Sequence, residues 1–122
     1  MTTDEFRVGG KVAIVTGAGR GIGKAIALVL AEAGADITVV ARTREQVGQT
    51  AEEIRQLGRK ALAMPADVTN EDQVKEVVAR TISEFGKIDI LVNSAGITSG
   101  MRPVVFVPGI KFPGWELAGD EW

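Results

Sequence analysis

The sequence predicts an α/β fold that forms the N-terminal part of a doubly wound parallel sheet. Three observations indicate it: short apolar runs alternate with amphipathic stretches, the links between them are short, and a glycine-rich turn follows the first run. Strand, helix and strand in repeated succession require crossover connections, which make the strands parallel. We therefore expect the succession β-α-β-α-β-α-β along the chain and the strand order 3-2-1-4 across the sheet.

Four apolar segments have the composition of buried strands. Segments 11–16, 36–41 and 88–93 are rich in branched residues, and segment 60–65 is a weaker example. Continuous runs of branched residues are typical of parallel strands that helices cover on both faces. These four segments are the strands that we expect in the sheet.

The stretches between the strands repeat apolar residues at every third or fourth position. This period predicts three helices that each pack one face on the sheet. The expected apolar stripes are Ile22, Ala25, Ile26, Val29, Leu30 and Ala33 in the first helix, Val47, Ala51, Ile54 and Leu57 in the second, and Val74, Val77, Val78, Thr81, Ile82 and Phe85 in the third.

Capping residues are expected at the helix ends. Thr43 with Gln46 fits a capping box at the start of the second helix, and Thr69 with Asp72 fits a looser version at the third. A glycine follows each stripe where a left-handed C-cap is expected, at Gly34, Gly58 and Gly86.

Composition and charge exclude several classes of protein. A chain of 122 residues with a net charge of -2 is one globular domain without the basic patch typical of nucleic-acid binding. It contains neither cysteine nor histidine, so we expect no disulfide and no metal site. The apolar runs are too short to span a membrane, and residues 1–11 lack the apolar core of a signal peptide. We expect a cytoplasmic protein.

The glycine-rich segment 15–23, VTGAGRGIG, lies between the first strand and the first helix. Backbone N–H groups and the dipole at a helix N-terminus favour an anion such as a pyrophosphate, and glycines let it approach the backbone. A tight turn without a ligand is the alternative. The residues expected to surround the pyrophosphate are Gly17, Gly19, Arg20, Gly21, Ile22 and Gly23.

The spacing of the glycines distinguishes three known motifs. The pattern G-x-G-x-x-G fails because Ile22 stands at its last position, and the P-loop pattern fails because of Ala18 and Ala25. Residues 16–23 fit T-G-x-x-x-G-x-G instead. This segment resembles the glycine motif of the short-chain dehydrogenase/reductase family, in its classical branch. Within the family the resemblance favours members similar to 3-oxoacyl-carrier-protein reductases or to sugar or steroid alcohol dehydrogenases.

Two further segments contribute to the resemblance, which covers about residues 10–97. Asp67 and Val68 look like the family's adenine-contacting pair, and segment 93–96, NSAG, looks like its N-N-A-G motif. The family usually has asparagine where Ser94 stands, but that position contacts the ribose largely through its backbone, so we expect the change to be tolerated. The resemblance implies cofactor-binding roles for Asp67, Val68, Asn93, Ser94, Ala95 and Gly96, with Asn93 more a structural tie than a ligand.

The end of the second strand indicates which nicotinamide cofactor binds. NAD-binding units place an acid there to bond the ribose 2′-hydroxyl, but this chain has Ala41, Arg42 and Thr43, and Asp36 lies at the opposite end of the strand. Arg42 can pair with a 2′-phosphate, and Arg20 adds a second positive charge. We expect NADP rather than NAD; the alternative is that Arg42 is only a solvated residue.

The resemblance implies hydride transfer between the nicotinamide and a carbonyl or alcohol substrate. In the family a tyrosine is the general acid/base, assisted by a lysine four residues later and by a serine, all in the half of the fold after the fourth strand. This chain has no tyrosine. We therefore assign no catalytic residue and expect the 122-residue chain to be inactive as a reductase by itself.

Residues 1–97 are accordingly interpreted as a Rossmann-type dinucleotide-binding half-domain of an NADP(H)-dependent oxidoreductase. Residues 98–122 contain three of the four prolines and no clear period, and we expect a loop or truncated tail. Expected partners are the nicotinamide dinucleotide and, in a complete protein, a small carbonyl or alcohol substrate and a second copy of the chain. The alternatives are a naturally short nucleotide-binding module and an interaction module that pairs through an exposed strand at 88–93.

Overall fold

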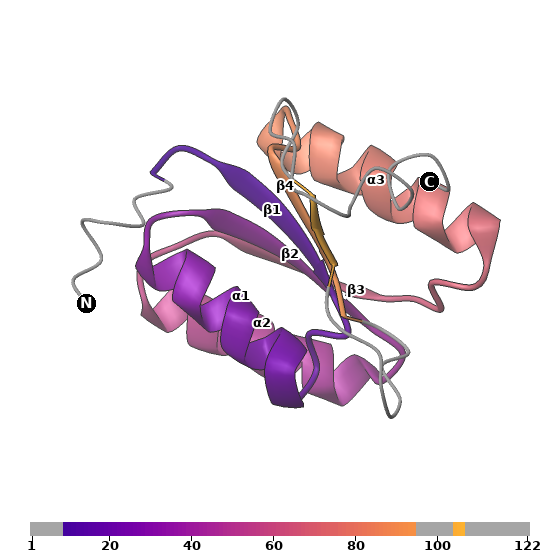
Figure 1. Ribbon diagram of the computed structural model, residues 1–122, viewed down its shortest axis with the longest axis horizontal. Helices are drawn as coiled ribbons and strands as arrows, with labels where there is room; N and C mark the ends of the chain where they lie inside the picture. Colours follow the sequence, from indigo (N-terminus) through magenta and orange to yellow (C-terminus); the bar gives the residue numbers. More distant parts are fainter. Residues whose placement is uncertain (1–8, 95–103, 107–122) are drawn as a thin grey trace.

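The computed structural model describes residues 9–94 and the backbone of residues 104–106, which together form one sheet with helices on both faces (Figure 1). The predicted succession of strands and helices is confirmed. The elements are β1 (Val12–Thr16), α1 (Gly21–Glu32), β2 (Asp36–Ala41), α2 (Arg44–Gln56), β3 (Ala61–Pro65), α3 (Glu71–Phe85), β4 (Ile90–Asn93) and β5 (Val104–Phe106).

The sheet has the order β3-β2-β1-β4-β5, which confirms the predicted order of the four parallel strands. Its register places Thr16 at the end of β1 between Val40 of β2 and Asn93 of β4. The carboxyl ends of these three strands therefore meet at one edge of the sheet. The order reverses at β1, the topology that creates a binding crevice in open α/β sheets.

Strand β5 was not expected from the sequence. It lies within residues 98–122, where we expected a loop, and pairs antiparallel with β4. The strand at 88–93, which the alternative of an interaction module required to be exposed, therefore has β5 on its outer side. Three residues pair with the backbone of β4, and such pairing depends on backbone hydrogen bonds more than on an apolar period.

Figure 1 shows α1 and α2 on one face of the sheet and α3 on the other. Because side chains alternate along a strand, neighbouring residues of β1 enter different cores. Val15 packs with α1 and α2, whereas Ile14 packs with Val77 of α3. The larger core contains Ala13, Val15, Ala27, Ala31, Ile37, Val39, Val47, Ala51, Ile54, Ile90 and Val92.

The buried face of α1 differs from the predicted stripe. Ala27 and Ala31 are buried against the sheet, while Ile22 and Val29, which the period assigned to the core, are each 56% exposed. Small side chains let a helix backbone approach the sheet closely, so the alanines occupy the contact line. The helix was predicted correctly, but the face that it buries is centred on other residues than those expected.

The predicted stripe on α3 is wider than the face that the structure buries. Val77 and Thr81 are buried, but Val74, Val78 and Ile82 are exposed. In the part of the chain that is described, only one side of α3 touches the sheet. No helix among these residues is both long and apolar enough to cross a membrane.

Both predicted capping boxes are wrong, although all three predicted glycines have positive φ. The side chain of Thr43 makes no capping bond at α2. At α3 the cap lies one residue later than expected: the Asn70 side chain accepts a hydrogen bond of 3.1 Å from the Gln73 backbone N–H. Thr69 does not cap α3, and it donates hydrogen bonds to Asp67 instead. The glycines have φ values of 109°, 84° and 84° at Gly34, Gly58 and Gly86.

Candidate functional site

A cavity of about 660 Å³ opens at the carboxyl edge of the sheet. Four separated stretches of the chain form its wall: the glycine turn, the end of β2 with the start of α2, the turn after β3, and the residue after β4. The wall therefore exists only because the strand register brings these four stretches together. Its residues are Gly17, Gly19, Arg20, Gly21, Ile22, Gly23, Ala41, Arg42, Thr43, Gln46, Ala66, Asp67, Val68, Thr69 and Ser94.

The glycine turn brings the start of α1 against the ends of β1 and β4. Gly17 has φ of 65°, a left-handed conformation that favours glycine. At Gly23 the constraint is space, because a Cβ atom there would overlap the carbonyl oxygen of Gly17 and the hydroxyl of Ser94. Glycine thus lets the first turn of α1 form the floor of the cavity.

The N-terminus of α1 has no negative group of its own. Arg20 is the N-cap residue, its side chain makes no capping bond, and the first turn of α1 contains no acid. At α3, by contrast, Asn70 caps the helix and two acids follow it in the first turn. The first N–H groups and positive dipole end of α1 are left for an external anion.

Two hydrogen bonds hold the glycine turn in place. The Ala18 backbone N–H donates to the Val40 carbonyl at 3.0 Å, and the Thr50 hydroxyl of α2 donates to the Ala18 carbonyl at 2.9 Å. Gly19 packs so closely on Gln46 that an added Cβ would lie 2.8 Å from its side chain. A side chain at position 19 would therefore collide with Gln46.

The ends of β1 and β4 are joined by polar contacts around Thr16. Its hydroxyl donates to Asn93 Oδ1 at 2.8 Å and accepts from the Ser94 backbone N–H at 3.1 Å. The Ser94 hydroxyl donates to the Thr16 carbonyl. Asn93 therefore ties the two strands together, while Ser94 reaches the cavity wall.

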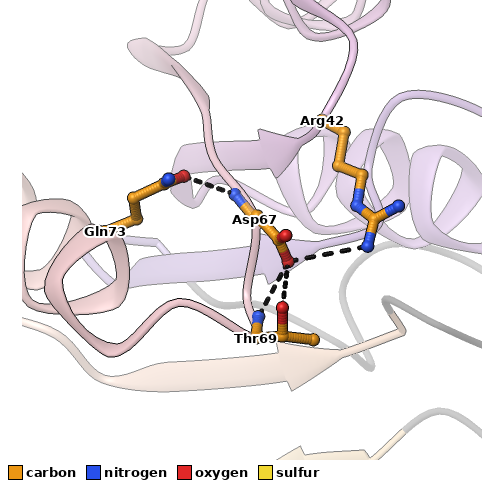
Figure 2. Close-up of polar contacts among 4 residues, drawn as sticks. All are labelled: Arg42, Asp67, Thr69 and Gln73. Atoms are coloured by element: carbon orange, nitrogen blue, oxygen red, sulfur yellow. Dashed lines mark hydrogen bonds and ion pairs between the residues drawn. The ribbon is translucent and has the colours of Figure 1, made fainter.

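Figure 2 shows a polar cluster around Asp67, in which Arg42, Asp67 and Thr69 belong to the cavity wall. Asp67 Oδ1 accepts hydrogen bonds from the Thr69 backbone N–H at 2.9 Å and from the Thr69 hydroxyl at 2.7 Å. The same oxygen lies 3.7 Å from Arg42 Nη2. The Thr69 hydrogen bonds, with a smaller contribution from the charge of Arg42, hold the pKa of the Asp67 carboxyl below its ordinary value of 3.8.

A model of the short chain dehydrogenase family matches residues 11–107, which include every strand of the sheet and the whole cavity wall. The chain belongs to the short-chain dehydrogenase family. The match covers most of the sequence and is not confined to the glycine motif.

Several members of the short-chain dehydrogenase family are similar to this chain over most of its length. The 7α-hydroxysteroid dehydrogenase of Escherichia coli K12 is 45% identical over 79% of the chain. The 3-oxoacyl-[acyl-carrier-protein] reductase of Staphylococcus epidermidis is 46% identical over 72% of it. The carveol dehydrogenase of Mycobacterium avium, solved in complex with NAD, is 32% identical over 79% of the chain with a TM-score of 0.73.

The similarity to these short-chain dehydrogenases is confined to part of their length. The chain covers 38% of the steroid dehydrogenase, 36% of the acyl-carrier-protein reductase and 39% of the carveol dehydrogenase. The comparisons therefore concern the part of the short-chain dehydrogenase fold that contains the glycine turn.

Most residues expected to bind the cofactor lie together in the structure. Asn93 is an exception, because it faces Thr16 and does not line the cavity. Ala95 and Gly96 lie outside the described residues. The expected residues that share the cavity wall are Gly17, Gly19, Arg20, Gly21, Ile22, Gly23, Arg42, Asp67, Val68 and Ser94.

Five residues of the cavity wall were not among the residues expected to bind the cofactor, although Ala41 and Thr43 had been named at the end of the second strand. Ala41 and Thr43 flank Arg42, and Thr69 follows the Asp-Val pair, so their neighbours could have indicated them. Gln46 and Ala66 had no such signal, because their positions depend on how α2 and the turn after β3 meet the glycine turn. Among the described residues, no group of acids is gathered in a way that could hold a metal ion.

Proposed function

We propose that this chain is the cofactor-binding part of an NADP(H)-dependent short-chain oxidoreductase. The observation that supports NADP is the place of Arg42, directly after β2 and on the wall of the cavity in front of the glycine turn. Ala41 offers no carboxylate to a ribose 2′-hydroxyl and leaves room for a phosphate. Asp36 lies at the other end of β2, so the strand itself supplies no acid here.

The remaining cavity wall fits the rest of a dinucleotide. The N-terminus of α1, with the space kept open by Gly23, would hold the diphosphate. Asp67 and Val68 would lie against the adenine, and Ser94 would lie near the nicotinamide ribose. In this proposal Arg42 provides the positive charge for a 2′-phosphate, and Arg20, which also lines the cavity, adds to it.

When bound, the cofactor would donate a hydride to a carbonyl in its reduced form or accept one from an alcohol in its oxidised form, while the residues of this chain bind and orient it. The reaction proposed for the whole protein is hydride transfer with a small carbonyl or alcohol substrate. Because the chain has no tyrosine, we assign it none of the catalytic groups. Oxidation of NADPH by ketones should stay at background when only these 122 residues are present.

The proposal is tested by comparing two nucleotides that differ only in the 2′-phosphate. Binding of adenosine 2′,5′-bisphosphate (2′,5′-ADP) and of 5′-AMP to the 122-residue chain is measured by calorimetry. Since a charge-assisted hydrogen bond contributes about 1.5–3 kcal/mol, Arg42→Ala should weaken 2′,5′-ADP roughly 10- to 100-fold and hardly affect 5′-AMP. Arg59→Ala is the matched control, because Arg59 pairs with Asp36 and does not line the cavity. Equal losses for both nucleotides in Arg42→Ala would contradict NADP specificity.

A further inference from the structure

We propose that Asp67 is a specificity-determining residue that limits the preference of this site for a 2′-phosphate. Its carboxylate lies beside Arg42, the residue assigned to that phosphate, and so lowers the positive charge that the phosphate meets. This inference rests on the proposed function, because it concerns the same NADP site.

The position of the carboxylate is fixed by its neighbours. The two Thr69 hydrogen bonds hold Oδ1, and the Asp67 backbone N–H donates to Gln73 Oε1 at 2.7 Å (Figure 2). Because the Thr69 bonds also hold the pKa of Asp67 below its ordinary value, the carboxylate is charged throughout the neutral range. A negative charge therefore stays on this wall of the cavity.

Arg42 is held much less firmly than Asp67. Its side chain is 75% exposed, and its contact with Asp67 is an ion pair of 3.7 Å. Exposed ion pairs of this kind contribute little to holding a side chain. The main effect of Asp67 on Arg42 is therefore its charge, and the guanidinium can still turn toward a phosphate.

A 2′-phosphate on Arg42 would lie close to the Asp67 carboxylate as well. Both groups are negative and share one guanidinium, and they would be nearer to each other than the screening length of about 8–10 Å in ordinary buffer. A nucleotide with a free 2′-hydroxyl would experience no such repulsion. Asp67 should thus weaken binding of 2′,5′-ADP relative to binding of 5′-AMP.

The deciding experiment is Asp67→Asn in the 122-residue chain. Asparagine keeps an acceptor oxygen for Thr69 and removes the charge. We expect the ratio of the 5′-AMP Kd to the 2′,5′-ADP Kd to rise about three- to tenfold, because the neutral side chain no longer repels the 2′-phosphate in this solvated site. A lost adenine contact would weaken both nucleotides alike, so the ratio isolates the phosphate. Raising the salt concentration should reduce this rise in the ratio, because salt screens the repulsion.

Asp36→Asn is the matched control. Asp36 also lies 3.7 Å from an arginine, Arg59, but at the amino end of β2, and it does not line the cavity. Asp36→Asn changes the net charge of the chain by the same amount as Asp67→Asn. The ratio of the two Kd values should nevertheless stay as in the unaltered chain. Asp67→Ser is a second neutral variant, with the same expected direction as Asp67→Asn.

The possible results separate this inference from the proposed function. If the unaltered chain discriminates through Arg42 but the Asp67 variants leave the ratio unchanged, the inference is wrong and the proposed function stands. A falling ratio would also overturn it, since Asp67 would then be a positioning residue that Arg42 needs. If the unaltered chain binds neither nucleotide, or if Arg42→Ala leaves the ratio unchanged, both proposals fail.

Discussion

Two glycines at the start of α1 are required for different physical reasons. Gly21 has φ of 61° and no atom near the place of a Cβ, so its backbone conformation is what favours glycine. Gly23 has an ordinary helical conformation but no room for a side chain. The spacing of this motif therefore combines one conformational and one steric requirement.

We predict opposite effects of adding a methyl group at two helical glycines. Gly23→Ala should lower the free energy of unfolding by about 1–3 kcal/mol, because the methyl group forces α1 away from the ends of β1 and β4. It should also reduce binding of 2′,5′-ADP and 5′-AMP alike. Gly48→Ala, on an exposed part of α2 with open space around it, should stabilise the chain by about 0.5–1 kcal/mol. Urea unfolding measures both; destabilisation by Gly48→Ala equal to that by Gly23→Ala would refute the steric explanation.

At the scale of the element, α3 meets the sheet along a narrow line. The Thr81 hydroxyl lies 2.8 Å from the Thr38 hydroxyl of β2, and both residues are fully buried. Thr81 also bonds to the Val77 carbonyl one turn earlier. A polar pair thus shares this interface with the apolar contact of Val77, and the residues on either side of the line remain exposed.

Adjacent valines of α3 should respond very differently to truncation. Val77 is 5% exposed and Val78 is 37% exposed. Val77→Ala should destabilise the chain by about 1–3 kcal/mol through lost burial and a small cavity, whereas Val78→Ala should change stability by less than about 1 kcal/mol. Chemical denaturation of the two variants gives the comparison. Equal losses would indicate that α3 buries the full stripe predicted from its period.

In the molecule as a whole, β1 and β4 are tied at both ends. Thr16 and Asn93 join them beside the cavity. At the far end the Val12 backbone N–H donates to Asp89 Oδ2 at 2.9 Å, and the Asp89 N–H donates to the Val12 carbonyl at 2.8 Å. Partial burial by itself would raise the pKa of Asp89, but the Val12 hydrogen bond and Lys87 more than offset it, so the pKa lies below 3.8.

This tie predicts a stability that depends on pH. A carboxylate whose pKa is lowered by folding stabilises the native state above its unfolded pKa, and that contribution disappears as the pH falls through the folded value. Stability should therefore decrease below about pH 4. Asp89→Asn should lower the free energy of unfolding by about 1 kcal/mol at pH 7 and flatten the decrease in acid. Unfolding curves from pH 7 to pH 2.5 test this; parallel profiles for both chains would exclude Asp89 as a source.

The sequence alone was sufficient for the succession of elements, the order of the parallel strands and the glycine turn. Each depends on local information: branched residues favour strands, a period near 3.6 favours helices, and glycine is required where φ is positive or space is absent. The sequence did not determine which faces of α1 and α3 are buried, since apolar residues recur on more than one side of each helix.

Only the tertiary structure decided which distant side chains meet at the cavity. The register of four strands brings Asp67 to Arg42, turns Asn93 toward Thr16 and sets Gln46 against Gly19. The pairing of β5 with β4 was also decided there. These contacts join residues far apart in the chain, and no local pattern encodes them, because each depends on where two elements end relative to one another once the sheet has formed.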